Sequence, residues 1–283
     1  MFNNRSFIIN SLQQIEHQSA PVRLLVFTGV LIILWLPLAI PIYLWLQHDS
    51  NLTTIVTMGL LFVELLLLWR FWGKYAYKES NIYAKYGLTF SNANKRDFIK
   101  GLALGFWFCL SLFITEALLG WVEIIPPSIS LLRIVIEGLI SAIAIAVAEE
   151  LVFRGWLLDE LQRDYGQRTC LWVNATLFAL AHFMKPLTEI IRTFVTFPAL
   201  ILLGLTLVLA KKKCRDRLGI CIGIHGGLVW GYYILNVGHL IEYTNKVPVW
   251  ITGIDGNPIA GVMGLIFLTI LMLINGSNLL ITK

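Results

Sequence analysis

The sequence predicts an all-α membrane protein, a polytopic transmembrane helical bundle of about eight spans. Of its 283 residues, 57% are hydrophobic and only 14% are charged, whereas a soluble domain carries about 25% charged residues. The mean hydropathy is +0.75. Apolar runs of roughly 20 residues recur along the chain, each long enough to cross a bilayer as a helix. The lipid bilayer is therefore an expected partner, and the net charge of +5 reflects topology rather than nucleic-acid binding.

The apolar runs define the expected organisation of the chain. Residues 1–22 are polar and predict a cytoplasmic or interfacial N-terminal segment, and 23–283 predict a single membrane-embedded domain with a motif core at about 131–241. The first run is too long for the core of a signal peptide, so we expect it to be retained. The predicted spans are 24–46, 52–72, 98–120, 131–158, 169–184, 198–210, 218–241 and 259–281.

The basic residues predict how these spans are oriented, because cytoplasmic loops are enriched in Lys and Arg. With a cytoplasmic amino terminus, most of the 22 Lys and Arg residues fall on the cytoplasmic side. The far side receives only Lys185, Arg192 and Lys246, with Arg133 near the start of a span. We therefore expect both termini to be cytoplasmic.

The fourth predicted span carries charges in the stretch Ala144–Leu158, which includes Glu149, Glu150 and Arg154. A charge at bilayer depth costs about 2.5–3.5 kcal/mol on insertion scales, and adjacent carboxylates disfavour each other's ionisation. Glu150 and Arg154 are four residues apart, so a structural reading pairs them on one helix face. That reading leaves Glu149 unexplained. We therefore interpret the stretch as a functional site.

His182 is expected at the same depth in the membrane as Glu149. The polar turn 163–168, with Gly166, predicts an antiparallel hairpin between the fourth and fifth spans. Glu149 and His182 lie equally far from this turn, and both helices rise 1.5 Å per residue, so their side chains can meet. A lone histidine here would read as a hydrogen bond between helices. Beside two glutamates, it indicates function.

The seventh predicted span supplies a second histidine, His225, a few residues from the basic cytoplasmic loop. It therefore lies in the same half of the membrane as the glutamates. Gly226 and Gly227 allow another backbone to approach closely. His225 is either a packing residue that bonds a neighbouring helix or a third catalytic group.

Two carboxylates and two histidines in a cavity open to the cytosol favour hydrolysis. A glutamate can take a proton from water, and a histidine can stabilise the oxyanion that forms at a carbonyl. Alternatively, Glu149, His182 and His225 can hold a divalent zinc ion (Zn2+). The sequence has no HExxH helix and no GxSxG elbow. The four cysteines show no CxxC spacing and read as buried small side chains.

The set Glu149-Glu150-x-x-x-Arg154, Phe178-x-x-x-His182 and a glycine-flanked His225 resembles the three motifs of the CPBP intramembrane protease family. That family includes CAAX-processing endopeptidases of the Rce1 type and bacteriocin-processing or immunity proteins. The resemblance implies a helical intramembrane endopeptidase that cuts a membrane-associated peptide or protein.

By the same resemblance, Glu149 and His182 activate water, Glu150 pairs with Arg154, and His225 lines the oxyanion hole. The segment 246–264 is similar to the cyanobacterial and plastid branch. This similarity implies a bacterial plasma membrane or a thylakoid membrane.

One position departs from the family pattern. Many members carry Asn four residues after the third-motif histidine, where this chain has Val229, which cannot donate a hydrogen bond. Tyr232 and Asn236 share the His225 face but lie two or three turns away, and neither obviously replaces it. This departure keeps open a catalytically quiet family member that acts as a membrane scaffold or immunity-like factor. A proton-coupled transporter using Glu64 and Glu116 is a third hypothesis, although no inverted repeat supports it.

Overall fold

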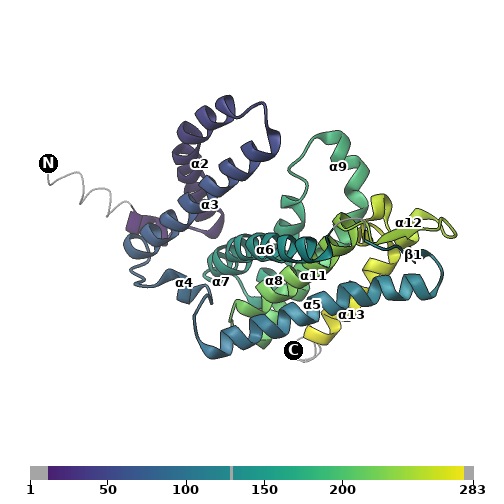
Figure 1. Cartoon of the computed structure of the whole chain (residues 1–283). Helices are drawn as coiled ribbons and strands as arrows, with labels where there is room; N and C mark the ends of the chain where they lie inside the picture. The colour runs from purple at the N-terminus through teal and green to yellow at the C-terminus, as the bar shows by residue number, and fades with distance from the viewer. Residues whose placement is uncertain (1–11, 128–129, 277–283) are drawn as a thin grey trace. The chain divides into compact units, whose positions relative to one another are not determined.

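The computed structural model describes residues 12–127 and 130–276, and these are almost entirely helical (Figure 1). Helices long and apolar enough to cross a bilayer number six in this part of the chain. Their ranges are α2 (Ala20–Trp45), α3 (Ser50–Tyr75), α5 (Asn92–Leu118), the continuous run Leu131–Gln162, the run Leu187–Lys213 and α11 (Gly219–Val237). The protein is thus a multi-pass integral membrane protein with the predicted helical architecture.

The two remaining predicted spans correspond to shorter helices. The run at 169–184 is α8 (Gln167–Ala181), and the run at 259–281 begins as α13 (Val262–Gly276), with residues 277–281 outside the described part. The predicted span 198–210 lies inside a longer stretch. That stretch consists of α9 (Leu187–Thr193), the 3-10 turn η2 (Phe194–Thr196) and α10 (Phe197–Lys213).

Many large apolar side chains lie on the surface of these helices, as expected for a protein whose solvent is lipid. Leu25 and Ile33 of α2 are 73% and 70% exposed, and Ile140 of the Leu131–Gln162 run is 65% exposed. A soluble protein rarely exposes apolar surface on this scale. The exposed apolar faces therefore support the assignment of these helices to the membrane.

The chain divides into two compact units. The first comprises residues up to Lys85 together with Glu160–Asp164. Its described helices include α2, α3 and the short α4 (Ile82–Lys85). The buried Arg23 donates from Nε to Glu160 Oε2 over 2.7 Å, and the Tyr77 hydroxyl donates to Glu160 Oε1 over 2.6 Å. Burial and the Glu160 carboxylate raise the pKa of Tyr77, so the hydroxyl remains a donor.

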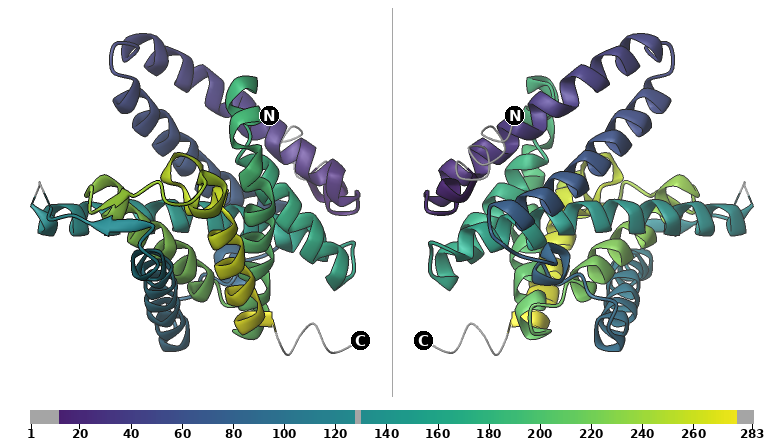
Figure 2. Two further views of the ribbon diagram at one scale, coloured as in Figure 1. Left: turned by 90° about the vertical axis from the view of Figure 1, so that its right-hand side faces the viewer. Right: turned by 90° about the vertical axis from the view of Figure 1, so that its left-hand side faces the viewer.

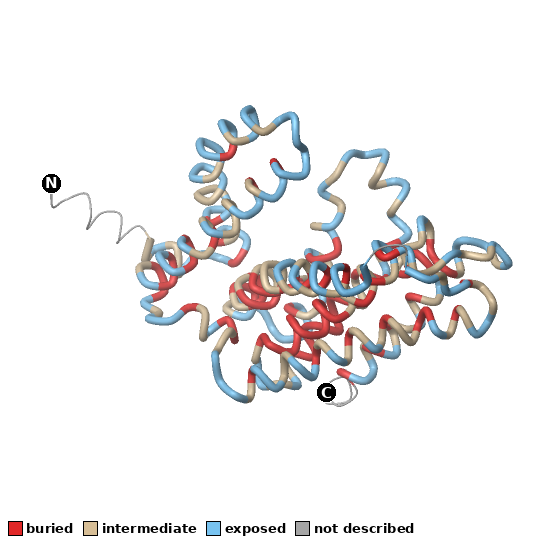
Figure 3. The backbone as a smooth tube through the Cα atoms, in the orientation of Figure 1, coloured by how far each residue is buried: buried red, intermediate tan, exposed pale blue. Residues whose placement is uncertain are grey.

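The second unit comprises Tyr86–Asp159 and Tyr165–Lys283 and contains both histidines and Glu149. Its buried residues gather along α10 and α11 (Figure 3). In α10, every residue from Leu203 to Lys211 is buried. The prediction of one domain over 23–283 is not decided by this division, and it stays a prediction.

A seam of glycines joins α5 and α11 within this unit, and the two helices lie side by side (Figure 2). Gly223 and Gly227 of α11 lie against the backbone at Phe98 and Leu102 of α5, where a Cβ atom would overlap carbonyl oxygens. Gly101 of α5 faces α11 in return, with the Ile220 carbonyl oxygen 2.6 Å from the position of an added Cβ. Small residues four apart permit this close approach in membranes.

A short two-stranded antiparallel sheet was not predicted from the sequence. Strand β1 (Val122–Ile124) follows α5, and β2 (Ile241–Tyr243) follows α11. Val122 pairs with Tyr243 and Ile124 with Ile241. Three-residue strands carry too little alternation to be recognised in an apolar sequence. The chain then forms α12 (Val249–Thr252) and the 3-10 turns η3 (Ile254–Gly256) and η4 (Pro258–Ala260).

Candidate active site

The two glutamates sit where the helix of the fourth predicted span changes its winding. Helix α6 (Leu131–Glu150) ends at Glu150 and passes into the π-helix η1 (Leu151–Leu157) and then α7 (Leu158–Gln162). A π-turn widens the helix, and such turns occur often at functional sites. Side chains from other helices satisfy carbonyl groups in this turn. Asn174 Nδ2 donates to the Phe153 carbonyl over 2.7 Å, and Lys211 Nζ donates to the Arg154 carbonyl over 2.6 Å.

Glu150 is the centre of a buried ion-pair network. Its Oε1 atom accepts hydrogen bonds from Arg154 Nη1 over 3.0 Å and from His225 Nδ1 over 2.9 Å. Glu150 and Arg154 are both fully buried, and His225 is nearly so. The predicted pair of Glu150 and Arg154 is thus present. Its contact with His225 fixes the ring of His225, with Nδ1 toward Glu150.

Glu149 lies opposite both histidines. Its Oε2 atom is 3.9 Å from His182 Nε2 and 4.0 Å from His225 Nε2. These separations are too long for direct hydrogen bonds, and a bridging water spans such distances in proteins. Glu149 Oε2 is itself buried and has no hydrogen-bond partner among the described residues. The depth argument that placed Glu149 beside His182 therefore agrees with their positions in the structure.

His182 follows the last residue of α8 and is held by its own helix. Its Nδ1 atom lies 2.8 Å from the Phe178 carbonyl oxygen. Because a carbonyl oxygen only accepts, Nδ1 carries a proton, and in the neutral tautomer Nε2 presents a lone pair. That lone pair is on the nitrogen nearest Glu149. His182 is one-third exposed, which keeps Nε2 accessible.

Phe178 contacts several residues of the site at once. Its ring centroid lies 4.6 Å from that of His182 and 6.3 Å from that of His225. The Arg154 guanidinium carbon lies 4.1 Å from the same ring, a cation–π contact. The motif Phe178-x-x-x-His182 assigned no role to Phe178. In the structure, the Phe178 ring contacts His182, His225 and Arg154.

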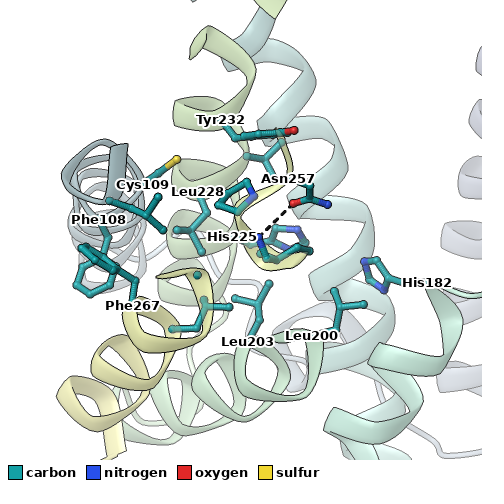
Figure 4. A pocket seen from close by; sticks show the side chains of 16 residues that line it. Phe108, Cys109, His182, Leu200, Leu203, His225, Leu228, Tyr232, Asn257 and Phe267 are labelled. Carbon is teal, nitrogen blue, oxygen red and sulfur yellow. Dashed lines mark hydrogen bonds between the residues drawn. The ribbon is translucent and has the colours of Figure 1, made fainter. Parts of the chain in front are cut away.

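A mostly apolar cavity of about 260 Å³ opens beside the two histidines (Figure 4). Residues of α5, α10, α11, α13 and the segment 257–259 line it, together with His182 at the end of α8. The lining residues are Phe108, Cys109, Leu112, His182, Leu200, Leu203, His225, Leu228, Val229, Tyr232, Asn257, Pro258, Ile259, Gly264, Phe267 and Leu268. An extended apolar segment or a lipid-like group fits such a lining. Asn257, Leu200 and Phe267 could not be assigned to the site from the sequence, because they come from distant parts of the chain.

The fit of a zinc ion depends on the spacing of its three expected ligands. Ligands of one tetrahedral zinc with bonds of about 2.1 Å lie roughly 3.4 Å apart. Here Glu149 Oε2 is 3.9 and 4.0 Å from the two histidine nitrogens. Among the residues that the structure describes, no group of three or more His, Cys, Asp or Glu side chains is suited to a metal ion. The side chains as placed do not fit zinc, and zinc binding stays a prediction for direct measurement.

The other ionisable residues of the spans are not among the residues that line the cavity. Arg133 Nε and Glu137 Oε1 form an ion pair at 2.7 Å, with both side chains exposed. Glu116 is fully buried, and neither of its carboxylate oxygens has a hydrogen-bond partner in the described structure. Neither Glu116 nor Glu64 is among the residues that line the cavity.

Comparison with known proteins identifies the part of the chain that carries this geometry. Residues 131–231 match the family described as type II CAAX prenyl endopeptidase Rce1-like. No curated protein and no solved structure matches the chain. The matched segment contains all five expected site residues: Glu149, Glu150, Arg154, His182 and His225. The match does not test the cyanobacterial or plastid lineage, which stays a prediction. The motif-bearing segment 131–231 is therefore similar to the Rce1-like family of type II CAAX prenyl endopeptidases.

Proposed function

We propose that this protein is an intramembrane endopeptidase that hydrolyses a peptide bond in a membrane-associated peptide or protein, of CAAX type or related. The observation that carries the proposal is the convergence of three groups. The Nε2 atoms of His182 and His225 lie within 4.0 Å of one unpaired Glu149 oxygen. Both histidines also line the apolar cavity, where a substrate chain can lie.

In the proposed first step, Glu149 and His182 activate a water molecule. The water donates one hydrogen bond to Glu149 Oε2 and the other to the Nε2 lone pair of His182, so both acceptors hold its protons. Its oxygen then attacks the carbonyl carbon of the scissile bond, and one proton passes to Glu149. When the tetrahedral intermediate collapses, the carbon–nitrogen bond breaks. The leaving amine takes the proton back from Glu149.

His225 is suited to stabilise the oxyanion of this intermediate. Its Nδ1 atom faces Glu150 Oε1 at 2.9 Å, so only Nε2 is directed toward Glu149. In the imidazolium form, the ring donates from both nitrogens, from Nδ1 to Glu150 and from Nε2 to the oxyanion. Glu150 then acts as a positioning residue, and Arg154 neutralises it. Donors aimed at a developing oxyanion are worth about 10²–10³ in rate each.

A second candidate function is a membrane scaffold or immunity-like factor. The observation that favours it is Val229, which lines the cavity where many family members carry an amide donor. On this reading the site binds a membrane-associated partner without cutting it. The two functions differ in one observable, the appearance of cleaved product.

The test is peptide cleavage by the purified wild-type protein in proteoliposomes, with metal content measured on the same sample. The panel contains a farnesylated CAAX peptide, the same peptide without the lipid and a hydrophobic membrane-spanning peptide. Mass spectrometry that shows cleavage at a defined bond supports the proposal. No product from any peptide by folded protein contradicts it and favours the scaffold. Stoichiometric zinc in active protein would contradict a metal-free mechanism.

A further inference from the structure

The cavity wall contains an amide that the sequence motifs do not include. Val229 lies four residues after His225 on α11 and lines the cavity, so the side chain at this position offers no hydrogen bond to an oxyanion. Asn257 lines the same cavity from a segment 28 residues further along the chain. It lies outside the family match, which ends at residue 231. We infer that the Asn257 side-chain amide is the second oxyanion donor, in place of the one missing at position 229.

The orientation of the Asn257 amide supports this role. Its Oδ1 atom accepts a hydrogen bond from the Ile259 backbone nitrogen over 3.2 Å, as the cap of η4 (Figure 4). This bond engages the amide oxygen with the backbone of its own loop, so the Nδ2 group is the part of the side chain left to bind another acceptor. Among the described residues, no partner takes a hydrogen bond from Nδ2. Two N–H groups are therefore available to an acceptor in the cavity.

The loop that presents Asn257 is held firmly in place. Two left-handed residues, Asp255 (φ 56°) and Gly256 (φ 69°), turn the chain immediately before it. The hydroxyl groups of Tyr232 and Tyr243 both donate to the Gly256 carbonyl, over 3.3 and 3.4 Å. Tyr232 belongs to α11, so the helix that carries His225 also anchors the loop that carries Asn257. A fixed donor is what oxyanion stabilisation requires, because it needs no reorganisation during the reaction.

The other polar groups near the cavity are less suited to this role. The Tyr232 hydroxyl proton is directed to the Gly256 carbonyl. Asn236 is exposed and does not line the cavity. The Cys109 thiol lines the cavity but is a weak donor. Asn257 combines a strong donor with a fixed position.

This inference rests on the proposed function, and the substitution Asn257→Asp separates a donor from a structural cap. Aspartate keeps the oxygen that accepts from Ile259 and caps as well as asparagine does, but it removes the N–H donors. If Asn257 is a donor, Asn257→Asp should lower kcat by about 10²–10³-fold with little change in KM or in the melting temperature. If Asn257 is only a cap, Asn257→Asp should keep the wild-type kcat.

The double variant Asn257→Asp with Val229→Asn provides a rescue. An amide at 229 lies on the His225 face, so it should raise kcat above that of Asn257→Asp alone. Wild-type kcat in Asn257→Asp, or a loss of kcat with a lowered melting temperature and no rescue, would overturn the inference. Glu149→Gln in the same assay separates the two proposals. Cleavage that needs Glu149 but not Asn257 overturns only this inference, and absence of cleavage by the wild type overturns both.

Discussion

Glu149 and Glu150 are neighbours in the chain but have opposite surroundings. Glu150 is fully buried between Arg154 and His225, and its charge is compensated. Glu149 is 32% exposed, and its Oε2 atom lacks a hydrogen-bond partner in the described structure. A carboxylate that is free to accept a proton is suited to act as a base, whereas one held by an arginine is suited to orient a neighbour. The two roles follow from these contacts.

The buried ion pair of Glu150 and Arg154 leads to a prediction about the stability of the protein. Replacing Arg154 by methionine leaves Glu150 buried without its cation, so we expect the free energy of unfolding to fall by about 3–5 kcal/mol. The matched control is Arg133→Met, which breaks an exposed pair of the same spacing in the same helix, with side chains 71% and 47% exposed. Thermal unfolding in detergent compares the two. Equal changes in melting temperature would contradict the account.

The sequence predicted some of these residues and could not predict others, for a physical reason. The pair of Glu150 and Arg154 follows from helix periodicity, and the approach of Glu149 to His182 follows from equal distances to one turn. Both arguments use local geometry only. The contact between His225 and Glu150 and the presence of Asn257 in the cavity depend on tertiary packing, for which the sequence has no periodic signal.

At the scale of elements, the glycine seam fixes where α11 places His225. Because Gly223 and Gly227 contact the backbone of α5 directly, the two helices cannot separate or slide without losing this packing. Gly226 lies on another face, near Ala142 and Ala146 of α6, the helix that ends at Glu150. α11 is therefore packed closely on both sides of the site. The sequence indicated close approach at Gly226 and Gly227 but not the partner helices.

A substitution in this seam tests its importance. We expect Gly227→Ala to lower stability by about 1–3 kcal/mol, because its Cβ overlaps the Leu102 carbonyl oxygen. The control is Gly59→Ala in α3, where an added Cβ has no atom within 4 Å. Alanine there should be neutral or slightly stabilising. If the melting temperatures of both variants match the wild type, the seam does not hold α11.

The π-helix η1 is the element that the sequence could not indicate. Residues 151–157 read as an ordinary apolar helix, and in the structure their Phe153 and Arg154 carbonyls accept hydrogen bonds from Asn174 and Lys211. These donors come from α8 and α10. Only the folded unit brings them together with η1. The strands β1 and β2 were missed for a similar reason, because each is only three residues long.

At the scale of the whole molecule, hydropathy and charge were sufficient for the fold class. Apolar runs located every long helix, although α8 with 15 residues is shorter than the expected fifth span. The orientation of the chain still rests on the distribution of Lys and Arg. We propose that both termini are cytoplasmic, which places the turn 163–168 and the basic segment 211–217 on the same side.

Accessibility of introduced cysteines measures this topology. The background is Cys214→Ser, because Cys214 is half-buried and the other three cysteines are buried. An impermeant maleimide added to intact cells should label Lys246→Cys, and it should label Lys78→Cys only after the cytoplasmic face is opened. The reverse pattern would contradict the proposed orientation and would move the site to the far half of the membrane.

In the proposed mechanism Glu149 accepts the proton of the attacking water, and the kcat of Glu149→Gln on a peptide that the wild type cleaves tests this role directly. Glutamine keeps the size of the side chain but cannot act as a base. We expect kcat to fall about 10²–10⁴-fold at an unchanged melting temperature, while the exposed control Arg133→Gln keeps wild-type kcat. A kcat of Glu149→Gln within a few-fold of the wild type would contradict the account.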